Sequence, residues 1–349
     1  MRASWAMAVV LLGLGACLGA ALVTRENGGR TATGTSPQTP APLELKYQPE
    51  VDKKKIEPLT PAPAPKDFGE RAFAHVRALT SFGVRTPGSP GWTKQLEYIE
   101  ATLRSAGLAV QRDTWTDRKE LLTFTNLTAT IPGKKKERIL LACHHDTKCT
   151  TGHTDPAHNF HFVGANDGAS GVAVLLALAP LLAATEHDAT IELVFFDGEE
   201  SLDWDWHGAA RALFGSKRYV KKHRDALLLG EEARIEALIL LDMVGRKDLH
   251  IQDELYSTLD LRQLAWSAAV ACGHDGHFFR VAEAASDDHA PFLDVGIPAL
   301  DLIDLRGNVY WHTKDDVIEN MAPQSLQIVA DVVLTMLPEV QRRYVTAKR

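Results

Sequence analysis

The chain has 349 residues, of which 45% are hydrophobic and 24% are charged, a composition that excludes intrinsic disorder and a polytopic membrane protein. It has 38 Lys and Arg against 45 Asp and Glu, so its formal net charge of -7 offers no overall basic field for binding nucleic acid. Four Cys in a chain of this length cannot be the framework of a small disulfide-stapled module, whereas fourteen His make metal chemistry worth considering.

Residues 1–23 have the pattern of an export segment rather than that of a folded domain. Arg2 precedes an apolar run at residues 5–23, and polar residues end this run. Such a run is typical of a cleaved signal peptide or of an uncleaved membrane anchor. Residues 14–17 also resemble the lipobox of bacterial lipoproteins, which makes Cys17 a candidate lipidation site. All three alternatives predict that the rest of the chain is extracytoplasmic, either periplasmic or secreted, with membrane anchoring through the N-terminus in two of them.

Residues 24–66 have the composition of a Pro-rich spacer. Eight of the 17 prolines lie between residues 27 and 66, and large apolar residues are few there. Such a segment is extended and would hold a folded domain away from a membrane. Residues 67–349 contain no second break of this kind and no internal repeat, so we expect one large domain and a monomeric protein.

Helical and strand patterns alternate along this domain. Amphipathic helices are predicted over residues 68–79 and 96–103, and strands near residues 110–114 and 127–131. Four short apolar runs follow at residues 139–143, 191–196, 235–241 and 298–303, separated by helical stretches such as 170–183 and 259–272. Near-continuous apolar strands between helices predict an α/β domain in which a mostly parallel central sheet has helices on both faces.

Each of the four apolar runs ends in acidic residues or histidine. These residues are His144, Asp146, Asp197, Glu199, Glu200, Asp242, Asp301 and Asp304. Open α/β sheets bind ligands beyond the carboxyl ends of their strands. So many acids at one edge would repel one another strongly unless a cation neutralised them, and the pattern therefore predicts a metal site.

Three of the candidate ligands complete a zinc site of the catalytic type. Asp167 lies in a tight Gly-containing turn before a helix, Glu200 follows a strand, and His312 lies in a late loop. Two carboxylates and one imidazole leave the fourth tetrahedral position of zinc free for water or substrate. Glu199, the neighbour of Glu200, remains available as a base because a metal-bound carboxylate is a poor one.

Five segments, in unbroken order, resemble the animal-type glutaminyl-peptide cyclotransferases, which share the zinc aminopeptidase fold of the M28 clan. The segments are residues 162–167, 195–200, 241–245, 287–293 and 311–316. Residues 144–148 are similar to the strand-end segment of the same family. The resemblance extends from about residue 68 to the C-terminus.

This resemblance implies a single zinc per chain, held by Asp167, Glu200 and His312. It implies that Glu199 is the general acid and base, with Asp242 and Asp287 in the hydrogen-bonded network beside it. The reaction implied is cyclisation of the N-terminal Gln, or Glu, of peptides and proteins to pyroglutamate, with release of ammonia from Gln.

The same resemblance implies a reaction pocket with aromatic walls. Trp311 is expected to form one wall, and either Trp204 or Trp206 another, because the chain is about two residues longer here than the family pattern. The His-rich segment at residues 151–161 has no counterpart in that pattern, and we expect it to be a solvated loop.

Cys143 and Cys149 flank the end of the strand that carries His144, and an exported chain permits a disulfide between them. The resemblance implies instead a pairing of Cys143 with a position near Gly171, where this chain has no cysteine.

A two-zinc M28 aminopeptidase is the alternative function. Asp167 would then bridge two metals, His144 and Asp242 would bind the second, and Glu199 would activate water. Trp311, directly before His312, and the Asp287 segment favour the cyclase.

Overall fold

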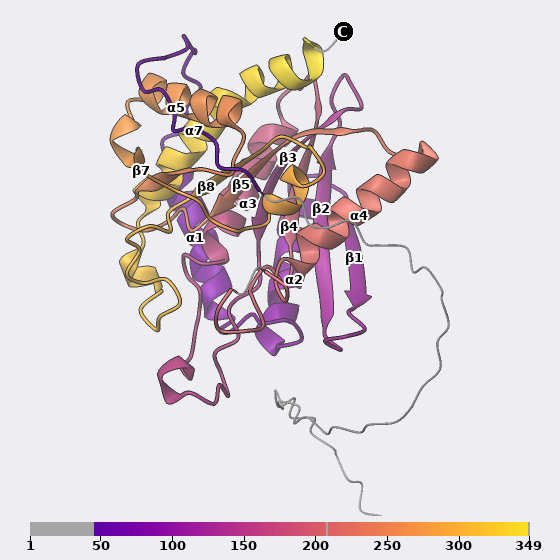
Figure 1. Cartoon of the computed structure of the whole chain (residues 1–349), viewed down its shortest axis with the longest axis vertical. Coiled ribbons are helices and arrows are strands. Elements are labelled where there is room, and N and C mark those ends of the chain that lie inside the picture. The colour runs from indigo at the N-terminus through magenta and orange to yellow at the C-terminus, as the bar shows by residue number, and fades with distance from the viewer. Residues whose placement is uncertain (1–44, 207–208, 348–349) are drawn as a thin grey trace, which may run out of the picture.

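A computed structural model describes residues 45–206 and 209–347 of the chain. Its central sheet has six strands in the order β1-β2-β4-β3-β5-β8, and a separate small sheet pairs β6 with β7 (Figure 1). The strands are β1 (Val110–Thr116), β2 (Thr123–Ile131), β3 (Arg138–His144), β4 (Thr190–Phe196), β5 (Ile235–Asp242), β6 (Ile251–Glu254), β7 (Phe278–Glu283) and β8 (Ala299–Ile303). The helices are α1 (Phe68–Ser81), α2 (Pro90–Ser105), α3 (Ala169–Ala183), α4 (Phe214–Leu229), α5 (Leu259–Cys272), α6 (Ala290–Leu293) and α7 (Pro323–Gln341).

The four strands predicted from apolar runs form the parallel part of the central sheet. β4, β3, β5 and β8 lie side by side and parallel, whereas β1 and β2 add an antiparallel edge. Every residue of β3 and β5 is buried, which explains why these strands have no polar alternation. Because the four strands run in one direction, their carboxyl ends meet at one edge of the sheet.

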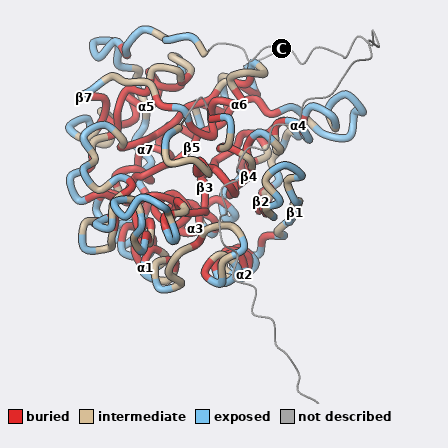
Figure 2. Tube along the Cα trace, turned by 60° about the horizontal axis from the view of Figure 1, so that its bottom comes forward, coloured by how far each residue is buried: buried red, intermediate tan, exposed pale blue. Residues whose placement is uncertain are grey.

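Helices cover both faces of the sheet, as predicted. Side chains such as Leu141 and Ile239 pack against α1, α3, α5 and α7 on one face. Their neighbours Leu140 and Leu238 point the other way and pack with Val220 of α4 and Phe292 of α6. Figure 2 shows the buried strands between these two layers. The period-two alternation of a strand thus builds two separate hydrophobic cores.

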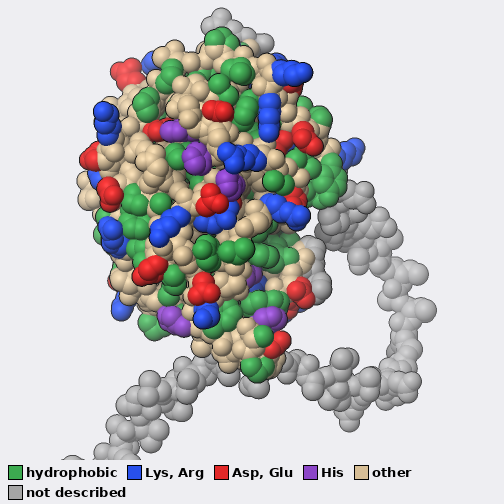
Figure 3. Space-filling view, turned by 90° about the vertical axis from the view of Figure 1, so that its left-hand side faces the viewer, with side chains coloured by type: hydrophobic (Ala, Val, Ile, Leu, Met, Phe, Trp, Pro, Cys, Tyr) green, Lys and Arg blue, Asp and Glu red, His purple; other side chains and the backbone are tan. Residues whose placement is uncertain are grey.

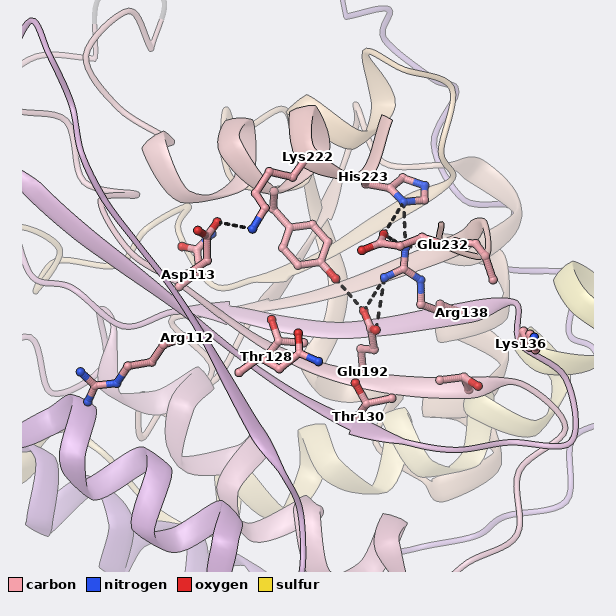
Figure 4. Close-up of a pocket in the computed structure, with 15 residues that line it drawn as sticks. Arg112, Asp113, Thr128, Thr130, Lys136, Arg138, Glu192, Lys222, His223 and Glu232 are labelled. Carbon is pink, nitrogen blue, oxygen red and sulfur yellow. Dashed lines mark hydrogen bonds and ion pairs between the residues drawn. The ribbon is translucent and has the colours of Figure 1, made fainter. Parts of the chain in front are cut away.

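The sequence did not predict α4, which a buried network of charges holds on the sheet (Figure 4). Arg138 contacts Glu192 at 3.2 Å and Glu232 at 2.8 Å, and from α4 the Tyr219 hydroxyl donates to Glu192 at 2.6 Å. These groups line a pocket of about 360 Å³ whose buried charges pair with one another. At its other end α4 begins beside the end of β4, where backbone N–H groups of residues 213 and 214 donate to the carbonyls of residues 199 and 198.

Residues 45–66, here called the N-terminal strap, are the described part of the predicted Pro-rich spacer, and they contact the folded domain that begins at residue 67. The strap is extended, as a Pro-rich segment should be, but it lies across α5 and α7 (Figure 1, indigo). Val51 N–H donates to Asp253 at 2.8 Å, and Ala64 N–H donates to Asp331 at 2.9 Å. Side chains distant in the sequence therefore accept hydrogen bonds from backbone N–H groups of the strap. From composition alone, these groups would be expected to bond to water.

The predicted export segment at residues 1–23, with Cys17, lies outside the described residues, as does the spacer up to residue 44. Among the residues that are described, no helix has the length and apolarity to span a bilayer. Acidic and basic side chains are interspersed over the face of the molecule shown in Figure 3.

Candidate metal centre and reaction pocket

The three predicted metal ligands lie together although they come from distant parts of the chain. Asp167 precedes α3, Glu200 follows β4, and His312 lies in the loop between β8 and α7. His312 Nε2 lies 3.5 Å from Asp167 Oδ2 and 3.2 Å from Glu200 Oε2, and all three side chains are buried. Within the described residues, Oε1 of Glu200 is buried and accepts no hydrogen bond. Two buried carboxylates with an unsatisfied oxygen and one imidazole fit a zinc ion.

Asp146 aligns the two adjacent glutamates at the end of β4. Its two carboxylate oxygens accept hydrogen bonds from the backbone N–H groups of Glu199 at 3.1 Å and Glu200 at 3.2 Å. Gly198, before them, has a φ of +68°, and a Cβ there would lie 2.5 Å from the ring of Phe124. Only glycine fits this turn, which lets the two glutamate side chains diverge.

Asp316 holds the backbone of the candidate ligand Asp167, a contact that sequence reasoning missed. Its carboxylate accepts hydrogen bonds from Asn166 N–H at 2.8 Å and Asp167 N–H at 3.0 Å. The signal was present in the segment 311–316, which carries His312 and ends in Asp316. The same segment thus supplies one candidate ligand and holds the backbone of another.

The three candidate acid and base residues Glu199, Asp242 and Asp287 line one pocket. Burial raises the pKa of Glu199 well above its usual range, and the charge of Asp287 acts in the same direction. Burial, followed by the charge of Asp242, raises the pKa of Asp287 to about 7. A carboxyl group with a pKa of about 7, such as that of Asp287, can hold and release a proton near neutral pH.

His144 creates a second group of metal-ligating atoms beside the first. Its Nε2 lies 3.1 Å from Asp242 Oδ1 and 3.3 Å from Asp167 Oδ1. Asp167 is therefore shared between the group with Glu200 and His312 and the group with His144 and Asp242. This is the arrangement that the two-metal aminopeptidase alternative requires, so the ligand positions alone do not separate the two functions.

His289, next to two aspartates in the sequence, is fully buried beneath the pocket. Its Nε2 lies 3.1 Å from Glu254 Oε2, and its Nδ1 lies 3.7 Å from Asp301 Oδ2. Burial alone would raise the pKa of Glu254, but the His289 imidazolium and nearby hydrogen-bond donors lower it to about 2. This ion pair fixes the segment that carries Asp287.

The pocket has a volume of about 420 Å³ and is walled by all three predicted tryptophans. Trp311 stacks on His312 with ring centroids 4.2 Å apart, and Trp204 meets the same imidazole nearly edge-on at 6.0 Å. Trp206 lines the pocket too, and packs on its other side against an apolar cluster with Leu213. Trp204 and Trp206 are thus both wall residues, although only Trp204 contacts the imidazole of His312.

The His-rich segment 151–161, predicted to be a solvated loop, folds back on the pocket wall. His158 stacks on the indole of Trp204 with ring centroids 3.6 Å apart and an interplanar angle of 5°. His153 contacts the same indole at 5.7 Å. Most residues of the segment are exposed, as predicted, but His153 and His158 are partly buried by these aromatic contacts.

The predicted disulfide between Cys143 and Cys149 is not formed in the described structure. Cys143 is fully buried in β3 and faces α3, where a Cβ added to Gly171 would lie 2.8 Å from its own Cβ. Burial raises the pKa of the Cys143 thiol well above its usual range. The cysteine fills space between sheet and helix instead.

Comparison with known proteins places this fold and site in a family. Residues 126–337 match peptidase family M28. A glutaminyl-peptide cyclotransferase-like protein of Bos taurus is 31% identical over 290 residues, which cover 73% of this chain and 72% of the relative.

Solved structures agree with this match. The crystal structure of an Acidobacteriales bacterium glutaminyl cyclase has a TM-score of 0.70 at 32% identity, covering 83% of this chain and 99% of that chain. The glutaminyl cyclase of Porphyromonas gingivalis has a TM-score of 0.68 at 30% identity, covering 78% and 98%. By the extent of both matches, this chain belongs to the glutaminyl-peptide cyclotransferases of peptidase family M28.

Proposed function

We propose that the protein is a zinc-dependent glutaminyl-peptide cyclotransferase, which converts the N-terminal Gln of peptides or proteins to pyroglutamate and releases ammonia. The observation that carries this proposal is the convergence of Asp167, Glu200 and His312 beside Glu199, in a pocket walled by tryptophans. The named relatives support it.

In this reaction the substrate's α-amine attacks the γ-carboxamide carbon of the same residue. A C–N bond to the α-amine forms, the bond to the amide nitrogen breaks, and water is not consumed. Because both groups belong to one residue, the enzyme mainly has to fold the side chain back and hold it there. A pocket of about 420 Å³ with indole walls can hold a single folded-back side chain.

Glu199 is the proposed general acid and base. It accepts a proton from the attacking amine and then donates a proton to the leaving nitrogen, which departs as ammonia. Asp242 and Asp287, which line the same pocket, accept hydrogen bonds from that nitrogen and share the proton with Glu199. Their raised pKa values suit this exchange.

Asp167, Glu200 and His312 are the proposed ligands of one zinc ion. When bound, zinc supplies Lewis-acid polarisation of the γ-carbonyl oxygen. The chain itself fixes the ligands: Asp316 orients Asp167, Asp146 orients Glu200, and Trp311 stacks on His312.

The test of this function is the mass of the product. Purified protein incubated with a Gln-initiated peptide should yield a peptide lighter by one ammonia, with every residue retained. Stepwise shortening of a Leu-initiated peptide, with release of free Leu, would show instead the aminopeptidase that the His144 group permits.

We further propose that the enzyme acts outside the cytoplasm, held at a membrane through Cys17. The lipobox-like residues 14–17 and the Pro-rich residues that follow support this proposal. Cell fractionation tests it: Cys17→Ala should release the protein from membranes or block its maturation. Unchanged attachment of the variant would indicate an uncleaved anchor, and soluble wild-type protein would indicate ordinary cleavage.

We also propose a monomeric enzyme, since the three candidate ligands converge without any contribution from a second copy of the chain. Sedimentation equilibrium at working concentration should give the mass of one chain.

A further inference from the structure

The His-rich loop at residues 151–161 has a defined structure of its own. It projects from the lower edge of the molecule in Figure 1 and contains a short 3-10 helix, Pro156–His158, capped by the side chain of Asp155. Two hydrogen bonds close it: Thr150 Oγ1 donates to the carbonyl of Phe160 at 2.6 Å, and Gly152 N–H donates to Asn159 at 3.0 Å. These bonds fix the direction in which the loop presents its side chains.

The loop presents a set of rings to Trp204. The His158 ring lies 3.6 Å from the indole and nearly parallel to it. His153 and Phe160 approach at 5.7 Å and 6.5 Å with steep interplanar angles. One face of Trp204 is thus covered by His158, while Trp204 also lines the reaction pocket and contacts His312.

The backbone that carries Trp204 is fixed separately. Lys148, buried after β3, donates from Nζ to the carbonyls of Ser201 at 2.7 Å and Asp203 at 2.9 Å. These bonds hold the segment after Glu200 but leave the indole free to rotate about its own side-chain torsions. The ring contacts from the loop, together with Lys148 Nζ at 6.0 Å from the centre of the indole ring, restrict that rotation.

We propose that His158 is a positioning residue that holds the Trp204 indole in place as a wall of the reaction pocket. The inference rests on the proposed function, since the wall contacts the side chain that is to be cyclised. His158 acts through Trp204 and does not line the pocket itself.

The ring of His158, rather than its nitrogens, makes this contact. Within the described residues its Nδ1 is buried without a hydrogen-bond partner, and the nearest carboxylate, that of Asp155, is 3.8 Å away. His158→Phe should therefore keep the ring contact with Trp204, whereas His158→Ala should lose it. An indole that is no longer held in place should weaken substrate binding more than it slows the chemical step, because Glu199 and the proposed metal ligands keep their positions.

Steady-state kinetics with a Gln-initiated peptide tests the proposal. His158→Ala should raise KM about 2- to 10-fold, the range that a stacked aromatic pair supplies, with kcat within about twofold of wild type. His158→Phe should restore KM. His161→Ala is the matched control, because His161 is an exposed histidine of the same loop and should leave both constants unchanged.

A wild-type KM in His158→Ala overturns the proposal, and so does a His158→Phe variant no better than His158→Ala. A double-mutant cycle with Trp204→Phe adds a check: the effect of His158→Ala on KM should largely vanish in that background. Equal effects in both backgrounds would mean that His158 acts by another route.

A measurement without turnover separates this inference from the proposed function. The fluorescence of Trp204 is obtained by subtracting the fluorescence of the Trp204→Phe variant from that of the protein that retains Trp204. Acrylamide should quench this fluorescence more strongly in His158→Ala than in wild type. Unchanged quenching overturns the positioning role whatever the reaction is. Failure of wild-type protein to cyclise the peptide, with the quenching difference present, would overturn the proposed function alone.

Discussion

Glu199 and Glu200 are adjacent in the chain but occupy different surroundings. Glu200 lies 3.2 Å from His312, and the charge of His312 lowers its pKa against the opposing effect of burial. Glu199 lies among the acids of the pocket, and burial raises its pKa. These opposite shifts agree with the proposed roles, in which Glu200 is a metal ligand and Glu199 the general acid and base.

Substitution of each glutamate by glutamine should separate the two roles. Glu199→Gln removes the proton acceptor but keeps size, so kcat should fall about 10²- to 10⁴-fold with zinc still bound. Glu200→Gln replaces an anionic ligand by a neutral amide, so zinc itself should be weakened or lost, and excess zinc should restore part of the activity. Zinc content by elemental analysis and kcat are measured on the same samples.

Equal loss of zinc from both variants would contradict this division of roles. A near-wild-type kcat in Glu199→Gln with zinc in place would contradict it as well, and would move the base to Asp242 or Asp287.

The meeting of the three candidate ligands could be predicted in part from the sequence. Glu200 follows β4 and Asp167 precedes α3, so the parallel sheet brings these two together, whereas His312 was placed by its segment's resemblance to the family. The stacking of His158 on Trp204 could not be predicted, because it joins two irregular segments whose paths no periodicity sets.

At the scale of elements, burial on both faces made the parallel strands predictable. α4 was missed because its sequence is mostly polar and few of its residues are buried. Its attachment depends on the buried pair of Arg138 and Glu192, which local pattern does not reveal. The strap was missed for a related reason: its partners Asp253 and Asp331 lie more than 200 residues away.

The strap should contribute strongly to stability. Its removal would take the buried side chains of Val51 and Ala64 out of the core and leave buried acceptors such as Asp253 Oδ2 without the donor that the strap supplies. Each such acceptor costs about 1–3 kcal/mol, so deletion of residues 1–66 should lower the free energy of unfolding by on the order of 5 kcal/mol. That corresponds to a fall in Tm of roughly 10 °C or more, measured by calorimetry.

Deletion of residues 1–44 is the matched control, because it removes the chain before the strap and leaves every strap contact. It should keep the Tm and activity of the mature protein. Equal Tm values for the two deletions would mean that the strap is held too weakly to matter.

At the scale of the whole molecule, the candidate metal site joins three parts of the chain that are otherwise linked through the sheet and its helices. Asp167 enters α3, Glu200 leaves β4, and His312 precedes α7. Without a cation, these buried carboxylates repel one another. Zinc should therefore stabilise the whole fold and not only the site.

Removal of zinc with a chelator should lower the Tm, and one equivalent should restore it. At a free zinc concentration of about 100 times Kd, binding contributes about 2.7 kcal/mol, or roughly 5–10 °C in Tm for a domain of this size. Glu200→Gln should show little recovery at the same zinc concentration, because it lacks a ligand.

The same titration decides between one metal and two. In the proposed cyclase, His144 and Asp242 bond to each other at 3.1 Å and take no metal, so a second equivalent should leave the Tm unchanged. His144→Ala should then bind one zinc as tightly as wild type does. Two tightly bound equivalents in wild type, of which His144→Ala loses one, would show that Asp167 bridges a metal pair and that the protein has the centre of an aminopeptidase.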